Sequence, residues 1–229
     1  MDIDISPRKV LITMVSVIGL LLFANILGLV STYVFHHPYL YGLIDLIDFD
    51  SEKNLPTLYS SLQLMLASSL LVVIGSRHKS SGESYAPWHA LAAIFLYLGI
   101  DEFVQIHERF LDFVREDFQL TGLFYYAWVV PYGIGVLTFV IAFSKFLMKL
   151  PRKTARWFIA SGAIFVTGAI GFEMLGARHY EAYGLDNVAY SILYTCEESL
   201  EMLGIALFVY ALLAYVANEF QYLRANIRD

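Results

Sequence analysis

The sequence predicts an all-α membrane protein, a polytopic helix bundle of about six transmembrane helices with both termini cytoplasmic. Hydrophobic residues make up 58% of the chain and charged residues 16%, and the mean hydropathy is +0.60. These values are too apolar for a soluble domain of 229 residues. The apolar residues also fall in long segments, and most basic residues fall between segments on one side. The chain is therefore expected to work inside a lipid bilayer.

The apolar segments number six, and each is long enough to cross a bilayer core of about 30 Å, which takes roughly 20 helical residues. They lie near residues 10–32, 57–75, 88–109, 123–147, 156–177 and 188–215. The first follows Arg8 and Lys9 without a clear small-residue cleavage site, so we interpret it as a retained anchor. Because no linker or change of composition divides the chain, we expect one integral membrane domain over residues 1–229.

The basic residues predict the orientation of these segments. With six crossings, only Lys53, Arg109, Arg115 and Arg178 of the 15 Lys and Arg residues fall on the outer side. Cytoplasmic loops of membrane proteins are rich in Lys and Arg. The bias places both termini in the cytoplasm of a multi-pass protein, and we expect the bacterial inner (plasma) membrane.

Several function classes are excluded by what the sequence contains. A single cysteine, Cys196, allows no internal disulfide and no cysteine-based metal motif. No basic stripe of the kind that binds nucleic acid forms, so the expected partner is the lipid bilayer. There is no P-loop, dinucleotide fingerprint or nucleophile elbow. The oligomeric state stays open.

Acidic residues interrupt three of the apolar segments at similar depth. At about 1.5 Å of rise per residue, the acids of the third, fifth and sixth segments overlap in the middle to outer part of the membrane. Each charged acid at such a depth costs about 2.5 to 3.5 kcal/mol on insertion scales, which marks it as a functional-site candidate. We predict that they converge on one cation site. The candidate ligands are Asp101, Glu102, His107, Glu108, Glu173, Glu197, Glu198 and Glu201.

Helical spacing predicts which of these side chains share a face. Asp101, Gln105 and Glu108 fall on one face of the third segment, with Glu102 beside it and His107 pointing away. Glu197 and Glu201 share a face of the sixth, with Glu198 next to them. His107 is therefore the least secure member of the set.

Three further patterns concern packing and the membrane interface. Residues 39–49 and 110–118 each have the spacing of a short amphipathic helix. Small residues crowd the fifth segment, including Gly162 and Gly168, and predict close helix contacts there. Aromatic residues near the outer end of the fourth segment fit an interfacial belt better than a cofactor site. They are Tyr125, Tyr126, Trp128 and Tyr132.

Four motifs together resemble a family of uncharacterised bacterial multi-pass membrane proteins. They are the run Asn54 to Ser61, Asp101-Glu102 followed by His107-Glu108, Glu173-Met174-Leu175-Gly176, and Glu197-Glu198-x-x-Glu201-Met202-Leu203-Gly204. The resemblance covers nearly the whole chain. It supports the acidic positions as a site and implies no particular activity.

Three functions are compatible with the acids. The first is a divalent-metal site of Fe, Mn or Zn, perhaps dinuclear and open to the outer side, since carboxylates with one imidazole suit such ions. It would make the protein a metal-dependent membrane oxidoreductase or hydrolase acting on a lipophilic or small substrate. The second is proton- or cation-coupled transport. The third is a structural membrane subunit whose acids form a packing network.

Overall fold

The computed structural model describes residues 6–106 and 120–219, and within these ranges every regular element is helical. The chain first forms α1 (Pro7–Tyr33), the short η1 (Leu40–Gly42) and α2 (Leu43–Ile47), and the hairpin of α3 (Leu55–Ser80) and α4 (Ala86–Val104). After η2 (Gly122–Phe124) come α6 (Val129–Lys149), α7 (Arg152–Val166), the π-helical η3 (Thr167–Phe172), α8 (Glu173–Tyr183) and α9 (Val188–Glu219). The all-α class predicted from the sequence is confirmed over this part of the chain.

Five helical segments of the described chain are long and apolar enough to cross a membrane. They are α1, α3, α6, the continuous run from α7 to α8, and α9. Each overlaps one of the predicted spans. The remaining predicted span, near 88–109, corresponds to α4, whose 19 residues include Asp101 and Glu102 close to its end. A count of six crossings stays a prediction.

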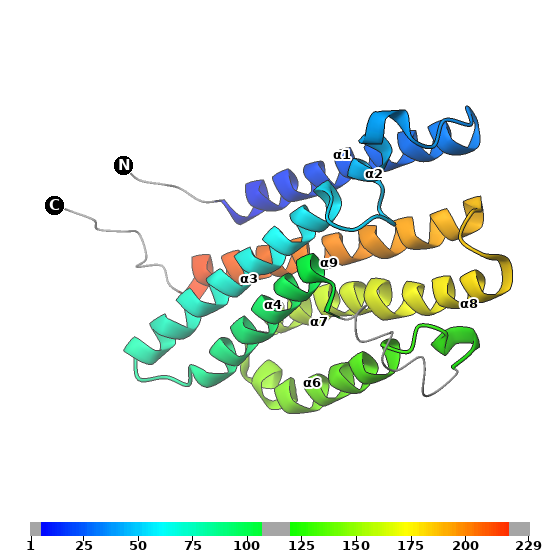
Figure 1. Ribbon diagram of the computed structural model, residues 1–229. Helices are drawn as coiled ribbons and strands as arrows, with labels where there is room; N and C mark the ends of the chain where they lie inside the picture. The colour runs from blue at the N-terminus through cyan, green and yellow to red at the C-terminus, as the bar shows by residue number, and fades with distance from the viewer. Residues whose placement is uncertain (1–5, 107–119, 220–229) are drawn as a thin grey trace.

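The long helices run side by side, so the bundle has two ends (Figure 1). At one end, which we call the terminal end, α1 begins and α9 finishes, and the α3–α4 and α6–α7 turns lie there as well (Figure 1). At the other, which we call the loop end, lie η1, α2 and the connection between α8 and α9 (Figure 1). The start of α1 and the end of α9 therefore lie at the same end of the bundle (Figure 1). Which side of a membrane that is stays a prediction.

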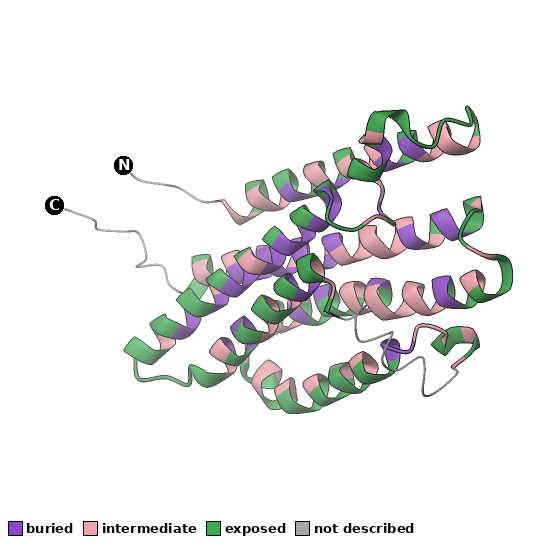
Figure 2. Ribbon diagram, in the orientation of Figure 1, coloured by how far each residue is buried: buried purple, intermediate pink, exposed green. Residues whose placement is uncertain are grey.

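Helix α9 is the centre of the bundle, because it packs against α1, α3, α7, η3 and α8. Its fully buried side chains include Met202, Val209 and Leu212, which are 0% exposed. Against them lie Leu71 of α3 and Trp88 of α4 in the same core. Buried positions are dense along α3, α4 and α9, whereas α6 is mostly exposed (Figure 2). Exposed apolar faces on outer helices are what a surrounding bilayer accommodates.

Close helix contacts form at only some of the glycines that predicted them. A methyl group added to Gly168 would lie 2.7 Å from the backbone oxygen of Glu197, and one added to Gly204 would lie 2.8 Å from the backbone nitrogen of Phe165. The prediction of close packing is thus confirmed for Gly168. It is wrong for Gly162, which has nothing within 4 Å.

The ends of the helices differ from the sequence expectation in two places. Helix α4 ends at Val104, and Gln105 takes the left-handed conformation with φ 62° and ψ 47°. The helical face that the spacing assigned to Asp101 and Gln105 together is therefore interrupted. Helix α6 begins at Val129 and not near residue 123, because Gly122–Phe124 forms a separate 3-10 turn.

The two predicted interfacial helices have different outcomes. Residues 39–49 do contain short helices, η1 and α2, and Ile44 of α2 is buried beside Gly28 of α1. The predicted helix at 110–118 lies outside the described residues.

Candidate functional site

The candidate site is built on the first half of α9. Glu197, Glu198 and Glu201 lie within five residues, a little over one helical turn, roughly 14 to 20 Å below the start of the helix at Val188. All three are half-buried. Because the helix places Glu197 and Glu201 four residues apart, these two side chains lie on the same face.

The second contributor is Glu173, the first residue of α8. It follows the six-residue π-helical segment Thr167–Phe172, a rare geometry that often accompanies functional sites. The side chain of Glu173 lies within electrostatic range of Glu197. The glycine at position 168 makes this possible, since it lets η3 approach the backbone of α9 at Glu197.

The third contributor is Glu102, near the end of α4. It lies within electrostatic range of both Glu198 and Glu201. Glu52, from the segment between α2 and α3, lies within range of the same two side chains. The sequence did not single out Glu52, because it stands in a polar loop where an acid is unremarked. We use "glutamate group" for Glu102, Glu173, Glu197, Glu198 and Glu201.

Asp101 faces a different neighbour from Glu102. It is 4% exposed and accepts a hydrogen bond of 2.8 Å from the hydroxyl of Tyr132 on α6. The Tyr132 hydroxyl in turn lies 2.9 Å from that of Tyr97 on α4. Tyr132, expected in an interfacial belt, thus joins a hydrogen-bond chain that runs from the buried Asp101 to the exposed Tyr97.

The segment before α3 folds down between α1 and α9. Asn25, in the apolar α1 and only 1% exposed, accepts a hydrogen bond from the Phe49 backbone N–H at 3.1 Å. Its amide also donates to the Thr195 hydroxyl at 2.9 Å. Asn54 holds the other end of the segment by donating to the backbone oxygens of Asp45 and Asp48. These contacts hold the loop against the bundle, with Glu52 within electrostatic range of Glu198 and Glu201.

Asp48 shows the electrostatic effect of this placement. Burial raises the pKa of Asp48 above its usual range, partly offset by hydrogen bonds that the carboxylate accepts from the Asp50 backbone N–H and the Tyr194 hydroxyl. The Asp48 carboxylate therefore holds its proton to a higher pH than it would in water.

Tyrosines line the space between the loop acids and Glu173. The hydroxyls of Tyr126 and Tyr190 lie 3.3 Å apart, and Tyr126 is within electrostatic range of both Glu173 and Asp50. Burial raises the pKa of Tyr126, so its phenol stays protonated and can donate at neutral pH. Sequence reasoning missed these inward contacts because aromatic residues near a span end usually mark the interface.

A surface groove at the loop end includes Glu52 in its lining. Its volume is about 440 Å³, and it is lined by Gly42, Asp45, Leu46, Ser51, Glu52, Lys53 and Asn54. Glu52 is exposed and is also within electrostatic range of Glu198 and Glu201. The groove is therefore the candidate entrance from this end of the molecule.

Several buried polar atoms have no protein partner among the described residues. They are the amide atoms of Gln63 and the hydroxyls of Ser60 and Ser199, with Nε2 of His89 nearer the terminal end. Ser60 and Gln63 lie on α3 beside Ser61, whose hydroxyl donates to the Gly99 backbone oxygen at 2.6 Å. Ser199 lies next to Glu198 on α9. Buried polar groups are rarely left unsatisfied, so water or another ligand is expected at these atoms.

The described residues do not, as they stand, form a metal site. Within residues 6–106 and 120–219, no three His, Cys, Asp or Glu side chains converge closely enough to hold one ion. Two of the predicted ligands, His107 and Glu108, lie outside the described residues. In the same ranges, no Lys, Arg or His pairs with Glu173, Glu197, Glu198 or Glu201, and the ion pair found joins His78 to Glu83 at the terminal end.

The described part of the chain is a helical bundle with five apolar helical segments of membrane-spanning length. The chain belongs to a family described as a domain of unknown function, DUF8692, which matches residues 12–216. The matched range includes every residue of the glutamate group. No curated protein and no solved structure matches the chain.

Proposed function

We propose that this is a multi-pass membrane protein that binds a cation at the glutamate group, entered from the loop end through the groove beside Glu52. One observation carries the proposal. Glu198 and Glu201 lie within electrostatic range of Glu102, and all three glutamates of α9 lie within range of Glu173. No basic side chain of the described residues pairs with these three glutamates. Such acids need a compensating positive charge.

The energetic argument is one of charge balance. A carboxylate inside a membrane protein costs several kcal/mol unless it is neutralised, and neighbouring carboxylates repel one another. Only a proton, a metal ion or a ligand cation offsets this cost when no Lys or Arg does. Buried polar atoms without a partner in the described ranges also favour an interior that holds water or an ion. They belong to Ser60, Gln63 and Ser199.

A divalent metal is the first occupant to test. Carboxylate oxygens suit Fe, Mn, Zn or Mg, and a metal would supply Lewis-acid or redox chemistry for a lipophilic or small substrate. Glu102, Glu198 and Glu201 are the side chains that would hold it. The side chains of the described residues do not converge on one ion as they stand. Action as a metal-dependent oxidoreductase or hydrolase remains part of the proposal.

The alternative occupant is a proton, which one contact favours. Glu173 and Glu197 are neighbouring carboxyl groups, and a proton bound by the pair would remove the repulsion between two carboxylates. Such a proton is what a proton-coupled transporter would load and release. In that case the groove beside Glu52 would admit protons or a coupled cation.

Metal analysis of the purified protein tests the first occupant. We expect close to one equivalent of Fe, Mn or Zn, or two if the site is dinuclear, and at least a tenfold loss of metal affinity in Glu201→Gln. Glu219→Gln is the matched control, since Glu219 is an exposed residue near the other end of the same helix. If metal stays bound in Glu201→Gln, the metal site lies elsewhere. If the purified protein holds no metal, the proton is the remaining candidate.

Proton flux in sealed vesicles tests the second occupant. Vesicles holding the protein should take up protons when a pH or ion gradient is imposed, and Glu197→Gln should stop the uptake while Glu219→Gln does not. A protein with neither bound metal nor cation flux would contradict the proposal as a whole and leave the structural role.

A further inference from the structure

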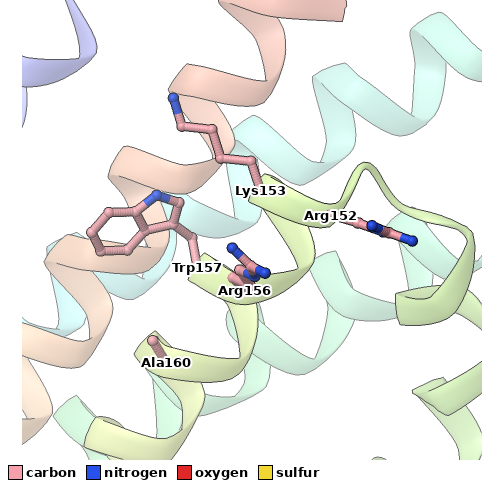
Figure 3. A pocket seen from close by; sticks show the side chains of 5 residues that line it. All are labelled: Arg152, Lys153, Arg156, Trp157 and Ala160. Atoms are coloured by element: carbon pink, nitrogen blue, oxygen red, sulfur yellow. The ribbon is translucent and has the colours of Figure 1, made fainter.

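A second charged feature lies at the terminal end, where α7 begins. A groove of about 740 Å³ is lined by Arg152, Lys153, Arg156, Trp157 and Ala160. The three basic side chains are exposed and project around the first turn of the helix, with Trp157 beside them (Figure 3). The groove lies at the terminal end of the bundle, where α7 begins (Figure 1).

The basic side chains have no acidic partner in the described ranges. The ion pair of the described chain joins His78 and Glu83, and no hydrogen bond from Arg152, Lys153 or Arg156 to a carboxylate is formed there. Arg152 and Arg156 stand four residues apart on one face, where like charges destabilise a helix. A bound anion would offset this repulsion, and the first backbone N–H groups of α7 add to the attraction.

The aromatic and apolar neighbours of these cations indicate the kind of anion. Trp157 is half-buried, with its ring edge-to-face against Tyr210 of α9 at 5.3 Å. Trp in a membrane-spanning helix marks the headgroup level of the bilayer. Ala160, one turn after Arg156, lines the groove together with Trp157. The groove therefore combines cationic side chains with an aromatic and an apolar one, which suits a ligand with an anionic head and an apolar tail, such as a phospholipid.

We propose that the groove at the start of α7 binds the phosphate headgroup of an anionic phospholipid. The Arg guanidinium groups at positions 152 and 156 suit a phosphate, which they can contact with two hydrogen bonds each. Lys153, directed toward α9 (Figure 3), adds a point charge on the other side of the groove. Basic pockets at the cytoplasmic ends of transmembrane helices bind such headgroups. This inference does not depend on the proposed cation site.

The test is a lipid titration of the full chain in detergent, read by Trp fluorescence and by thermal unfolding. Phosphatidylglycerol should bind and stabilise the protein, whereas phosphatidylcholine and millimolar inorganic phosphate should not. The double variant Lys153→Gln/Arg156→Gln should weaken binding of phosphatidylglycerol by about tenfold or more. The matched double variant Lys145→Gln/Lys149→Gln removes the same charge from the end of α6 and should change it less than about twofold.

Three results would overturn the assignment. One is equal weakening by the two double variants, which would show general attraction to a charged surface. Another is equal binding of phosphatidylcholine, and the third is equal stabilisation by inorganic phosphate. Trp157→Leu provides a second check, since it keeps every charge and should weaken lipid binding without altering salt dependence.

Discussion

The two halves of α9 pack against opposite chemistry. From Val188 to Glu201 the helix faces acids, tyrosines and a polar loop, and its glutamates keep partial exposure. From Met202 onward it faces an aromatic and aliphatic core, in which Val209 and Leu212 are 0% exposed. Trp88 packs edge-to-face on Phe146 and Phe158 in that second half. One continuous helix thus has a polar first half and a largely apolar second half.

The difference shows what each half contributes. The apolar half of α9 holds the bundle together, because close packing and apolar burial stabilise each of its helix contacts. The polar half keeps charges that cost free energy, which natural proteins retain mainly where function needs them. The predictions below test this division, in order of decreasing effect.

The largest loss of stability is expected from an acid placed in the core beside the apolar half of α9. Leu71 is 0% exposed, so Leu71→Glu would bury a carboxylate without a partner and should lower the free energy of unfolding by about 3 kcal/mol or more. Thermal unfolding of the purified variant measures this. Leu71→Met should cost less than about 1.5 kcal/mol. Equal unfolding temperatures for Leu71→Glu and Leu71→Met would mean that this half of the bundle tolerates a charged side chain.

A smaller but still large effect is expected where the halves meet η3. Gly168→Ala would put a methyl group 2.7 Å from the Glu197 backbone oxygen, so α9 and η3 must move apart at a cost of about 1 to 3 kcal/mol. Gly162→Ala, with nothing within 4 Å, should stabilise the helix by up to about 1 kcal/mol. Opposite shifts in unfolding temperature are expected, and shifts of the same sign would contradict the packing described.

The contact that draws the loop into the bundle comes next. Asn25→Leu would leave the buried Phe49 N–H without the acceptor it has now, at a cost of about 1 to 3 kcal/mol. It should also detach the loop before α3, so hydrogen exchange at Phe49 should rise well before exchange in α9. Unchanged protection at Phe49 would mean that Asn25 does not hold the loop.

The smallest effect is a pH dependence in the loop itself. Because the pKa of Asp48 is raised in the folded protein by burial, the native state holds the proton more tightly than the unfolded chain. Its contribution to stability is therefore fully present below the unfolded pKa and is lost as pH rises through the folded pKa. Asp48→Asn should flatten this fall in an unfolding series over mildly acidic pH.

The matched control for Asp48 is Asp186→Asn, a change in an exposed connection between α8 and α9. It should leave the pH profile as it is. A profile that is flattened equally by both variants would locate the dependence elsewhere.

The sequence predicted several residues around the glutamate group and missed others. The helical period placed Glu197 and Glu201 on one face, and segment lengths placed Glu173 at a comparable depth. Glu52 and Asn25 were missed, because a loop acid and a lone amide carry no periodic signal. Their positions follow from contacts between residues far apart in the chain, such as the one between Asn25 and Thr195.

The sequence by itself determined that the chain is a bundle of long apolar helices and which of them carry acids, because hydropathy and helical period are local properties of the chain. Tertiary structure alone decided that Glu102 faces α9 while Asp101 meets Tyr132. It also decided that Gly168 is a contact while Gly162 is open. Neighbouring residues in one helix are chemically alike on paper, and only the packing of other helices around them gives each a different partner.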